Sequence, residues 1–122
     1  MKLFFLTGTV LLLVDMIYLN IITNYFNKQI NAIQGSNISI DFLAAFICYI
    51  FLTLGLYYFI VRDNRELFDA FLLGLVVYMV YETTNKATLK NWKWNTVLID
   101  GIWGGLLFMI TTFIVYKIKK YI

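Results

Sequence analysis

Residues 3–23, LFFLTGTVLLLVDMIYLNIIT, form an apolar run in which Asp15 is the only charged residue. A helix needs roughly 20 apolar residues, each rising about 1.5 Å, to cross the roughly 30 Å hydrocarbon core of a bilayer. The run therefore predicts a transmembrane helix. Lys2 before the run resembles the start of a signal peptide, but Asp15 and the lack of a small-residue cleavage site favour a retained helix.

Three further runs have similar character and lie at about residues 42–61, 67–84 and 96–116. The whole chain is 61% hydrophobic and 14% charged, with a mean hydropathy of +0.78. Soluble domains average about 25% charged residues, so the bilayer is the expected solvent for this chain. We predict an all-α fold: one integral membrane bundle of four transmembrane helices with short loops, in a multi-pass chain that spans residues 1–122.

The composition also excludes several kinds of chemistry. Histidine is absent, which removes the commonest metal ligand and the commonest general base near neutral pH. The sequence contains no phosphate-binding glycine loop, catalytic triad or zinc-ligand spacing, so we expect neither a metal site nor a cofactor. Cys48 is the only cysteine and cannot form an internal disulfide. The net charge of +3, with Lys119 and Lys120 near the end, indicates membrane anchoring rather than nucleic-acid binding.

The connections between the runs set the expected topology. Residues 25–41 are mostly polar and end in SNISID, where Ser39 or Asp41 can cap the second helix. Residues 62–66, RDNRE, predict a tight charged turn, so the second and third helices should form an antiparallel hairpin. With both termini on one side, that side holds six basic residues and the other side four. Basic residues favour the cytoplasmic side, so we expect both termini to be cytoplasmic.

Three acids lie within or at the ends of the predicted spans. Asp15 is near the middle of the first span, Glu82 is in the last turn of the third, and Asp100 is near the start of the fourth. A charge at the bilayer centre costs about 2.5–3.5 kcal/mol on insertion scales, so such residues usually face the interior and mark function. No Lys or Arg lies centrally in any span, so Asp15 must be protonated, accept hydrogen bonds, or hold a cation.

Helical periodicity places each acid on a polar stripe with aromatic residues and, in two spans, a glycine that permits close helix approach. The stripes are Leu11, Asp15, Tyr18 and Ile22; Gly74, Tyr78, Tyr81, Glu82 and Asn85; and Asp100, Trp103, Gly104, Leu107 and Thr111. We expect these stripes to meet around a polar pocket, with the second helix in a supporting role. The alternative is that these polar residues only hold the helices together, at about 0.6 kcal/mol each. The pocket candidates are Asp15, Tyr18, Tyr78, Tyr81, Glu82, Thr84, Asn85, Thr88, Asp100 and Trp103.

The stretch after Glu82, TTNKATLKNWKWN, would be polar on both faces if helical. One interpretation is a solvated loop in which Trp92 and Trp94 anchor at the membrane interface, as aromatic belts do. The other is that Thr and Asn side chains turn inward to line the mouth of the pocket while the lysines point outward. We expect a combination of the two.

The block GLVVYMVYETTNKATLKNW followed by DGIWGG resembles a family of small bacterial and viral predicted membrane proteins that carries a domain of unknown function. The matching positions are Gly74, Tyr78, Tyr81, Glu82, Thr84, Asn85, Ala87, Thr88, Leu89, Trp92, Asp100, Trp103 and Gly104. Family members more often carry Asp at the position of Glu82 and a proline shortly after that of Trp92. The resemblance implies a four-span membrane protein and brings no known activity with it.

Three functions fit these observations. The first is a structural or interaction subunit, whose acids pair with basic residues of another membrane protein or of a second copy. The second is binding or transport of a proton, cation or amine through Asp15, Glu82 and Asp100. The third is an enzyme acting on a lipid or isoprenoid, with a carboxyl group as general acid or base. The lipid bilayer is the expected partner in every case, and nucleic acid is not.

Overall fold

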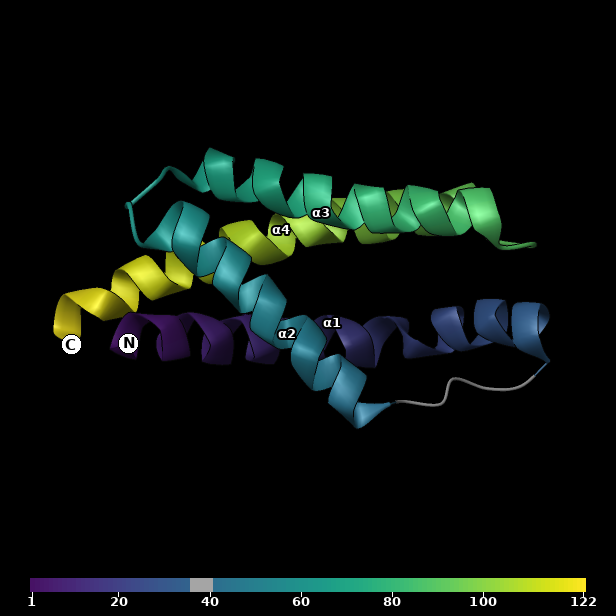
Figure 1. The fold of residues 1–122 in the computed structure, drawn as a ribbon, viewed down its shortest axis with the longest axis horizontal. Helices are drawn as coiled ribbons and strands as arrows, with labels where there is room; N and C mark the ends of the chain where they lie inside the picture. The colour runs from purple at the N-terminus through teal and green to yellow at the C-terminus, as the bar shows by residue number, and fades with distance from the viewer. Residues whose placement is uncertain (36–40) are drawn as a thin grey trace.

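The computed structural model describes residues 1–35 and 41–122, and the described residues contain helices and no strand. The helices are α1 (Lys2–Gln34), α2 (Phe42–Leu56) continued by the π-helical η1 (Tyr57–Val61), α3 (Leu67–Thr88) and α4 (Trp94–Ile118) followed by η2 (Lys119–Tyr121). All four main helices are long and apolar enough to cross a membrane. The predicted all-α bundle of four membrane helices is confirmed. Both termini lie at the same end of the bundle (Figure 1).

α1 is much longer than the predicted span. It continues through residues 24–34, most of the segment predicted as a polar connection, and that part of the prediction is wrong. Phe26 and Ile30 keep the apolar spacing of the helix. Gly35 then ends the helix in a left-handed conformation, with a φ of 77°, and its backbone N–H donates to the Asn31 carbonyl oxygen. At about 1.5 Å per residue, 33 residues extend roughly 50 Å, well beyond the hydrocarbon core. We call residues 24–34 the α1 extension.

The second helix begins where the sequence predicts. Asp41 is its N-cap, and its side chain accepts a hydrogen bond from the backbone N–H of Ala44 at 3.1 Å. Ser39, the other predicted cap, lies outside the described residues. The turn at residues 62–66 is short, as predicted, and the Tyr116 hydroxyl donates to the Arg65 carbonyl oxygen at 2.7 Å. α3 runs back from this turn against the direction of α2, but the predicted hairpin is splayed, because α2 is inclined to α3 and packs on α1 instead (Figure 1).

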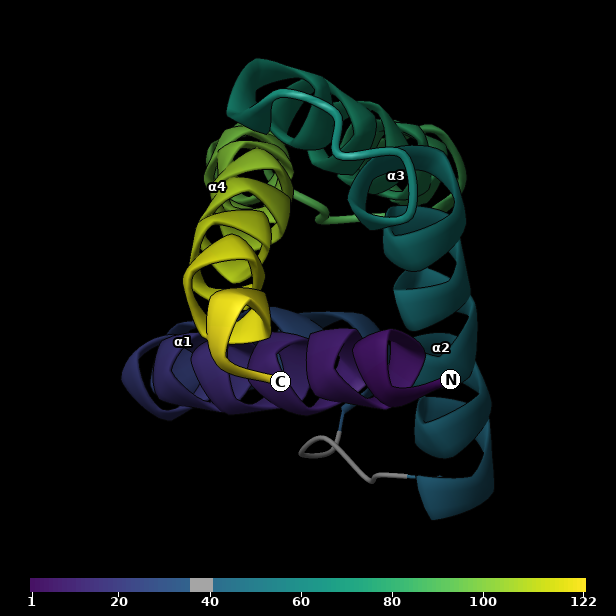
Figure 2. The same cartoon turned by 90° about the vertical axis from the view of Figure 1, so that its left-hand side faces the viewer.

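The closest helix pair is α3 with α4, and glycines make it possible. A Cβ atom added to Gly74 would overlap the carbonyl oxygen of Gly104, and one added to Gly104 would overlap the Tyr78 ring. α4 also packs on α1, so it lies between α3 and α1 on one side of the bundle (Figure 2). The predicted role of the two glycines in close approach is confirmed.

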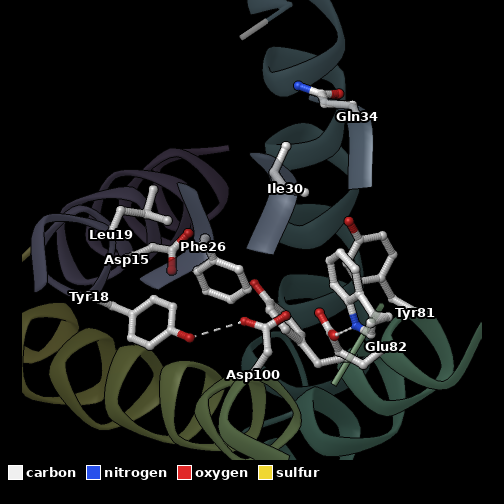
Figure 3. A pocket seen from close by; sticks show the side chains of 11 residues that line it. Asp15, Tyr18, Leu19, Phe26, Ile30, Gln34, Tyr81, Glu82 and Asp100 are labelled. Carbon is white, nitrogen blue, oxygen red and sulfur yellow. Dashed lines mark hydrogen bonds between the residues drawn. The ribbon is translucent and has the colours of Figure 1, made fainter. Parts of the chain in front are cut away.

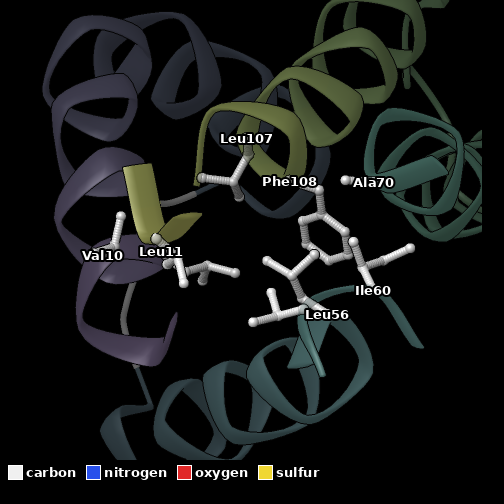
Figure 4. Close-up of a cluster of buried hydrophobic side chains, with 9 residues drawn as sticks. Val10, Leu11, Leu56, Ile60, Ala70, Leu107 and Phe108 are labelled. Atoms are coloured by element: carbon white, nitrogen blue, oxygen red, sulfur yellow. The ribbon is translucent and has the colours of Figure 1, made fainter. Parts of the chain in front are cut away.

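A cluster of buried apolar side chains packs between the helices (Figure 4). Leu11, Leu56, Leu107 and Phe108 are at most 1% exposed. On α1 and α3 the cluster residues precede the acids, and on α4 they follow Asp100. The cluster therefore closes the bundle between the acids and the chain termini.

The outer surface is apolar, whereas much of the interior is polar. Exposed large hydrophobic residues include Phe42 at 79% and Phe46 at 64%, while Thr7, Glu82 and Thr111 are at most 1% exposed. Such extensive exposure of large apolar side chains is expected when lipid surrounds the helices, and the buried polar residues lie beside an apolar core.

Candidate functional site

The three acids converge on one pocket between α1, α3 and α4 (Figure 3). Its volume is about 430 Å³. Asp15, Glu82 and Asp100 are 5%, 1% and 8% exposed, respectively. The remaining walls are aromatic or aliphatic, apart from Gln34 at one end. They are formed by Tyr18, Leu19, Phe26, Ile30, Tyr78, Tyr81 and Trp92.

Asp15 accepts hydrogen bonds on both carboxyl oxygens. The Trp103 indole N–H donates to Oδ1 at 3.0 Å, and the Tyr49 hydroxyl donates to Oδ2. The donors come from α4 and α2, so Asp15 ties three helices together. A buried carboxyl group with both oxygens bonded meets the general requirement that buried polar atoms have partners.

Asp100 is joined to Asp15 through a pair of stacked rings. The Tyr18 hydroxyl donates to Asp100 Oδ1 at 3.3 Å. The Tyr18 ring stacks on the Trp103 ring, with centroids 4.5 Å apart and planes 6° from parallel. The same two rings therefore position one donor toward Asp15 and one toward Asp100.

Glu82 completes the group. The Trp92 indole N–H donates to Glu82 Oε1 at 2.8 Å. Asp100 lines the same pocket as Glu82. We call the three acids with Tyr18, Tyr49, Trp92 and Trp103 the acid network.

Among the residues that the structure describes, the hydrogen-bond donors of the acid network are all neutral. Within residues 1–35 and 41–122, the ion pairs are Arg62 with Asp63, in the turn before α3, and Arg65 of that turn with Asp69 in the first turn of α3. In this part of the chain, no three or more Asp, Glu or Cys side chains are arranged so that they could hold a metal ion. The charge of the buried acids is therefore not balanced by a basic side chain that the structure describes.

The structure brings most of the candidate residues together. Six of them line the pocket: Asp15, Tyr18, Tyr78, Tyr81, Glu82 and Asp100. Trp103 does not line the pocket but donates a hydrogen bond to Asp15. The hydroxyls of Thr84 and Thr88 instead donate to backbone carbonyls one turn earlier, at 2.7 and 2.8 Å, and both residues are exposed. Asn85 is half-buried and does not line the pocket. The expectation that threonines form the pocket mouth is therefore wrong.

The sequence interpretation missed two hydrogen-bond donors. The sequence predicts Trp92 at the membrane interface, but its side chain is 5% exposed and its indole N–H donates to Glu82. Trp94, at 62% exposed, has the exposure of an interface residue. The sequence predicts a supporting role for the helix that carries Tyr49, yet the Tyr49 hydroxyl donates to Asp15. No local pattern distinguishes Trp92 from Trp94. For Tyr49, the available signal was a hydroxyl within an otherwise apolar span.

The α1 extension also contributes unpredicted residues. Phe26, Ile30 and Gln34, each four residues apart, follow one helical face that continues from Asp15 and Leu19 toward the end of the helix. The pocket therefore runs along α1 from the middle of the bundle to the end away from the termini. The polar composition of residues 24–34 does not predict a helix, because its inner face has few apolar residues.

Fold and site together define a small multi-pass membrane protein whose acids surround an internal, partly aromatic pocket. A family model described as "Predicted membrane protein (DUF2177)" matches residues 1–117, so the chain belongs to this family. The resemblance inferred from the residue pattern is thereby confirmed. No curated protein and no solved structure matches the chain.

Proposed function

We propose that this protein binds an ammonium group within the membrane and exchanges it for a proton held by the buried acids Asp15, Glu82 and Asp100. The observation that carries the proposal is the convergence of three buried acids on one pocket, without a basic side chain beside them among the described residues. Ionisable groups at membrane depth commonly belong to ion or proton pathways.

Charge balance supports this function. Taking a carboxylate out of water is costly unless an opposite charge or a proton compensates it. The neutral donors Tyr18, Tyr49, Trp92 and Trp103 orient the carboxyl oxygens without neutralising them. A proton or a bound cation must therefore supply the missing positive charge, and each can replace the other.

The pocket walls favour an organic cation. Aromatic faces attract ammonium groups by about 0.5–2 kcal/mol each, and Tyr18, Phe26, Tyr78, Tyr81 and Trp92 surround the acids. The volume of about 430 Å³ falls within the range typical of small-molecule sites. Leu19 and Ile30 extend the apolar wall along α1. An amine with a short hydrocarbon chain matches both the charge and the shape.

The acids are poorly placed to pair with another subunit. A partner helix approaching from the lipid would have to reach carboxyl groups that are 8% exposed or less. For this reason we favour internal cation binding over the interaction subunit that the sequence also suggested.

The test measures binding of hexyltrimethylammonium to the protein in lipid nanodiscs by tryptophan fluorescence, with empty nanodiscs subtracted. Octanol serves as a neutral ligand of similar length. We expect wild-type protein to bind the cation more tightly than octanol, because only the cation interacts with the acids. Glu82→Gln and Asp100→Asn should each weaken cation binding by roughly thirtyfold, as expected for a removed charge in a buried pair, and leave octanol binding nearly unchanged.

Two matched variants control for the loss of one negative charge. Glu66→Gln and Asp63→Asn make the same chemical changes at exposed positions of the turn before α3. Both should bind the cation like wild type. Equal binding of cation and octanol by the folded wild-type protein would rule the proposed function out.

A further inference from the structure

A second pocket lies on the other side of the α1 extension. It has a volume of about 500 Å³ and is separate from the acid network. Whereas Phe26 and Ile30 line the acid pocket, the neighbouring helical face lines this one. Its walls are Tyr25, Lys28, Gln29, Ala32, Asn91 and Lys93. Part of the α1 extension, the turn after α3 and the residue that precedes α4 therefore enclose it.

Gln29 lines this second pocket and is the buried residue among its walls. Its Oε1 accepts hydrogen bonds from the backbone N–H of Lys93 and from the Thr96 hydroxyl, both at 2.9 Å. A backbone N–H can only donate, which fixes the carboxamide with its oxygen toward α4. Gln29 is 4% exposed, and its Nε2 has no hydrogen-bond partner among the described residues. A buried amide donor without an acceptor is unfavourable by about 1–3 kcal/mol, so an acceptor is missing here.

Three positive features meet at the same place. α4 begins at Trp94 and has no side-chain cap of its own, so the positive end of its helix dipole points to this region. Lys28 and Lys93 both line the pocket and are exposed. Neither is in an ion pair with another described residue. Backbone N–H groups at a helix start together with lysines form a typical site for an anion, phosphate in particular.

The position of the pocket suits a lipid headgroup. α4 has 25 residues, close to the roughly 20 that the hydrocarbon core requires, so its first residues lie near the level of the lipid phosphates. Trp94 at the start of α4 is 62% exposed, as expected for an aromatic residue at the membrane interface. The α1 extension continues past this level.

We propose that this pocket binds the phosphate of an anionic lipid headgroup. The Gln29 carboxamide supplies a neutral donor, Lys28 and Lys93 supply charge, and the start of α4 supplies its dipole. The α1 extension would then be fixed to the turn and α4 in part by the bound lipid.

Gln29→Glu separates lipid binding from helix capping. It keeps an oxygen that accepts from Lys93 and Thr96, and it replaces the N–H₂ group with a second oxygen that repels phosphate. The experiment measures retention of dioleoylphosphatidylglycerol by native mass spectrometry, after release of the protein from mixed phosphatidylglycerol and phosphatidylcholine nanodiscs. We expect wild-type protein to retain one phosphatidylglycerol, and Gln29→Glu to bind it about tenfold or more weakly.

Lysine variants test whether the site is specific. Lys28→Gln and Lys93→Gln should each weaken phosphatidylglycerol binding by about fivefold, the effect expected for one basic residue near an anionic surface. Lys90→Gln removes the same charge from an exposed position at the same end and should have little effect. Equal losses in all three lysine variants, or unchanged binding in Gln29→Glu, would overturn the proposal.

A second arm distinguishes a lipid from a free phosphate. Inorganic phosphate at millimolar concentration is added, in neutral detergent, to lipid-free protein and to protein that retains one phosphatidylglycerol. Weak phosphate binding that Gln29→Glu abolishes would support recognition of the phosphate group itself. Phosphate that binds and displaces the phosphatidylglycerol completely at low millimolar concentration would contradict a lipid as the preferred ligand.

Discussion

At the scale of single residues, the fold depends on how buried acids are satisfied. Asp15, Glu82 and Asp100 accept hydrogen bonds from tyrosine hydroxyls or tryptophan indoles. These donors are themselves largely apolar, so they can lie between helices in a membrane while their one polar group faces a carboxyl group.

Replacing Asp15 tests this arrangement. Asp15→Asn keeps an acceptor oxygen, whereas Asp15→Leu leaves the Tyr49 hydroxyl and the Trp103 N–H without an acceptor. We expect Asp15→Leu to unfold more easily than Asp15→Asn by about 1–3 kcal/mol, measured by unfolding in mixed micelles with SDS. Adding Tyr49→Phe should restore part of the lost stability in the Asp15→Leu variant, but should not stabilise the Asp15→Asn variant. Equal stabilities of the two Asp15 variants would show that the hydrogen bonds contribute nothing.

Sequence reasoning predicts the acids better than their partners. Asp15, Glu82 and Asp100 are conspicuous because charged residues are rare in apolar spans, and helical spacing correctly turns them toward the interior. Their donors Tyr49 and Trp92 come from a different helix and from a turn. Such contacts depend on how the helices pack against one another, and the periodicity of a single helix gives no information about that packing.

At the scale of helices, α3 and α4 form the tightest pair and α1 the most unusual element. The glycines of α3 and α4 were predictable, because small residues at helical spacing indicate close packing in membranes. The continuation of α1 to Gln34 was not. Polar residues such as Asn24 and Asn27 have lower helix propensity than those of the preceding span, but the inner face of the α1 extension packs beside the acid pocket and overrides that preference.

The α3–α4 contact gives a stability prediction. Gly74→Ala would place a Cβ on the backbone of Gly104, which has no flexible side chain to move aside. We expect destabilisation by about 1–3 kcal/mol, the usual effect of overpacking, in the same micelle unfolding assay. Gly55→Ala on α2 is the matched control, because nothing lies within 4 Å of the added atom. It should be neutral or slightly stabilising, since alanine favours helix by about 1 kcal/mol over glycine.

The α1 extension gives a proximity prediction. Asn91 Nδ2 lies 3.5 Å from the Ala32 carbonyl oxygen, so these positions are neighbours. In a Cys48→Ser background, Ala32→Cys together with Asn91→Cys should cross-link efficiently with a short bismaleimide. The pair Ala32→Cys and Lys119→Cys, at opposite ends of the bundle, should not. If the first pair fails to react while both thiols remain accessible, the extension does not lie beside this turn.

At the scale of the whole molecule, the two ends of the bundle differ. One end holds both termini and is closed by the apolar cluster, whereas the acid pocket extends along α1 toward the other. Composition and hydropathy were enough to predict four helices and an even number of crossings. They could not predict which helices pack together. α2 and α3 are adjacent in sequence, yet α2 packs on α1 and α3 packs on α4.

Basic residues predict the orientation of the bundle. The end with the termini carries six basic residues: Lys2, Arg62, Arg65, Lys117, Lys119 and Lys120. The other end carries four: Lys28, Lys86, Lys90 and Lys93. We predict that both termini are cytoplasmic. A C-terminal green fluorescent protein fusion should fluoresce and a C-terminal alkaline phosphatase fusion should be inactive; the opposite pattern would reverse the orientation.

The exchange of an ammonium group for a proton is the central claim, and proteoliposomes with an internal pH dye test it most directly. Hexyltrimethylammonium is added outside; it carries a permanent charge and cannot change the internal pH as a permeant weak base. We predict that wild-type protein moves protons out as the cation enters, that Glu82→Gln abolishes this movement, and that Glu66→Gln retains it. Folded wild-type protein that gives no more proton movement than protein-free liposomes would contradict the account.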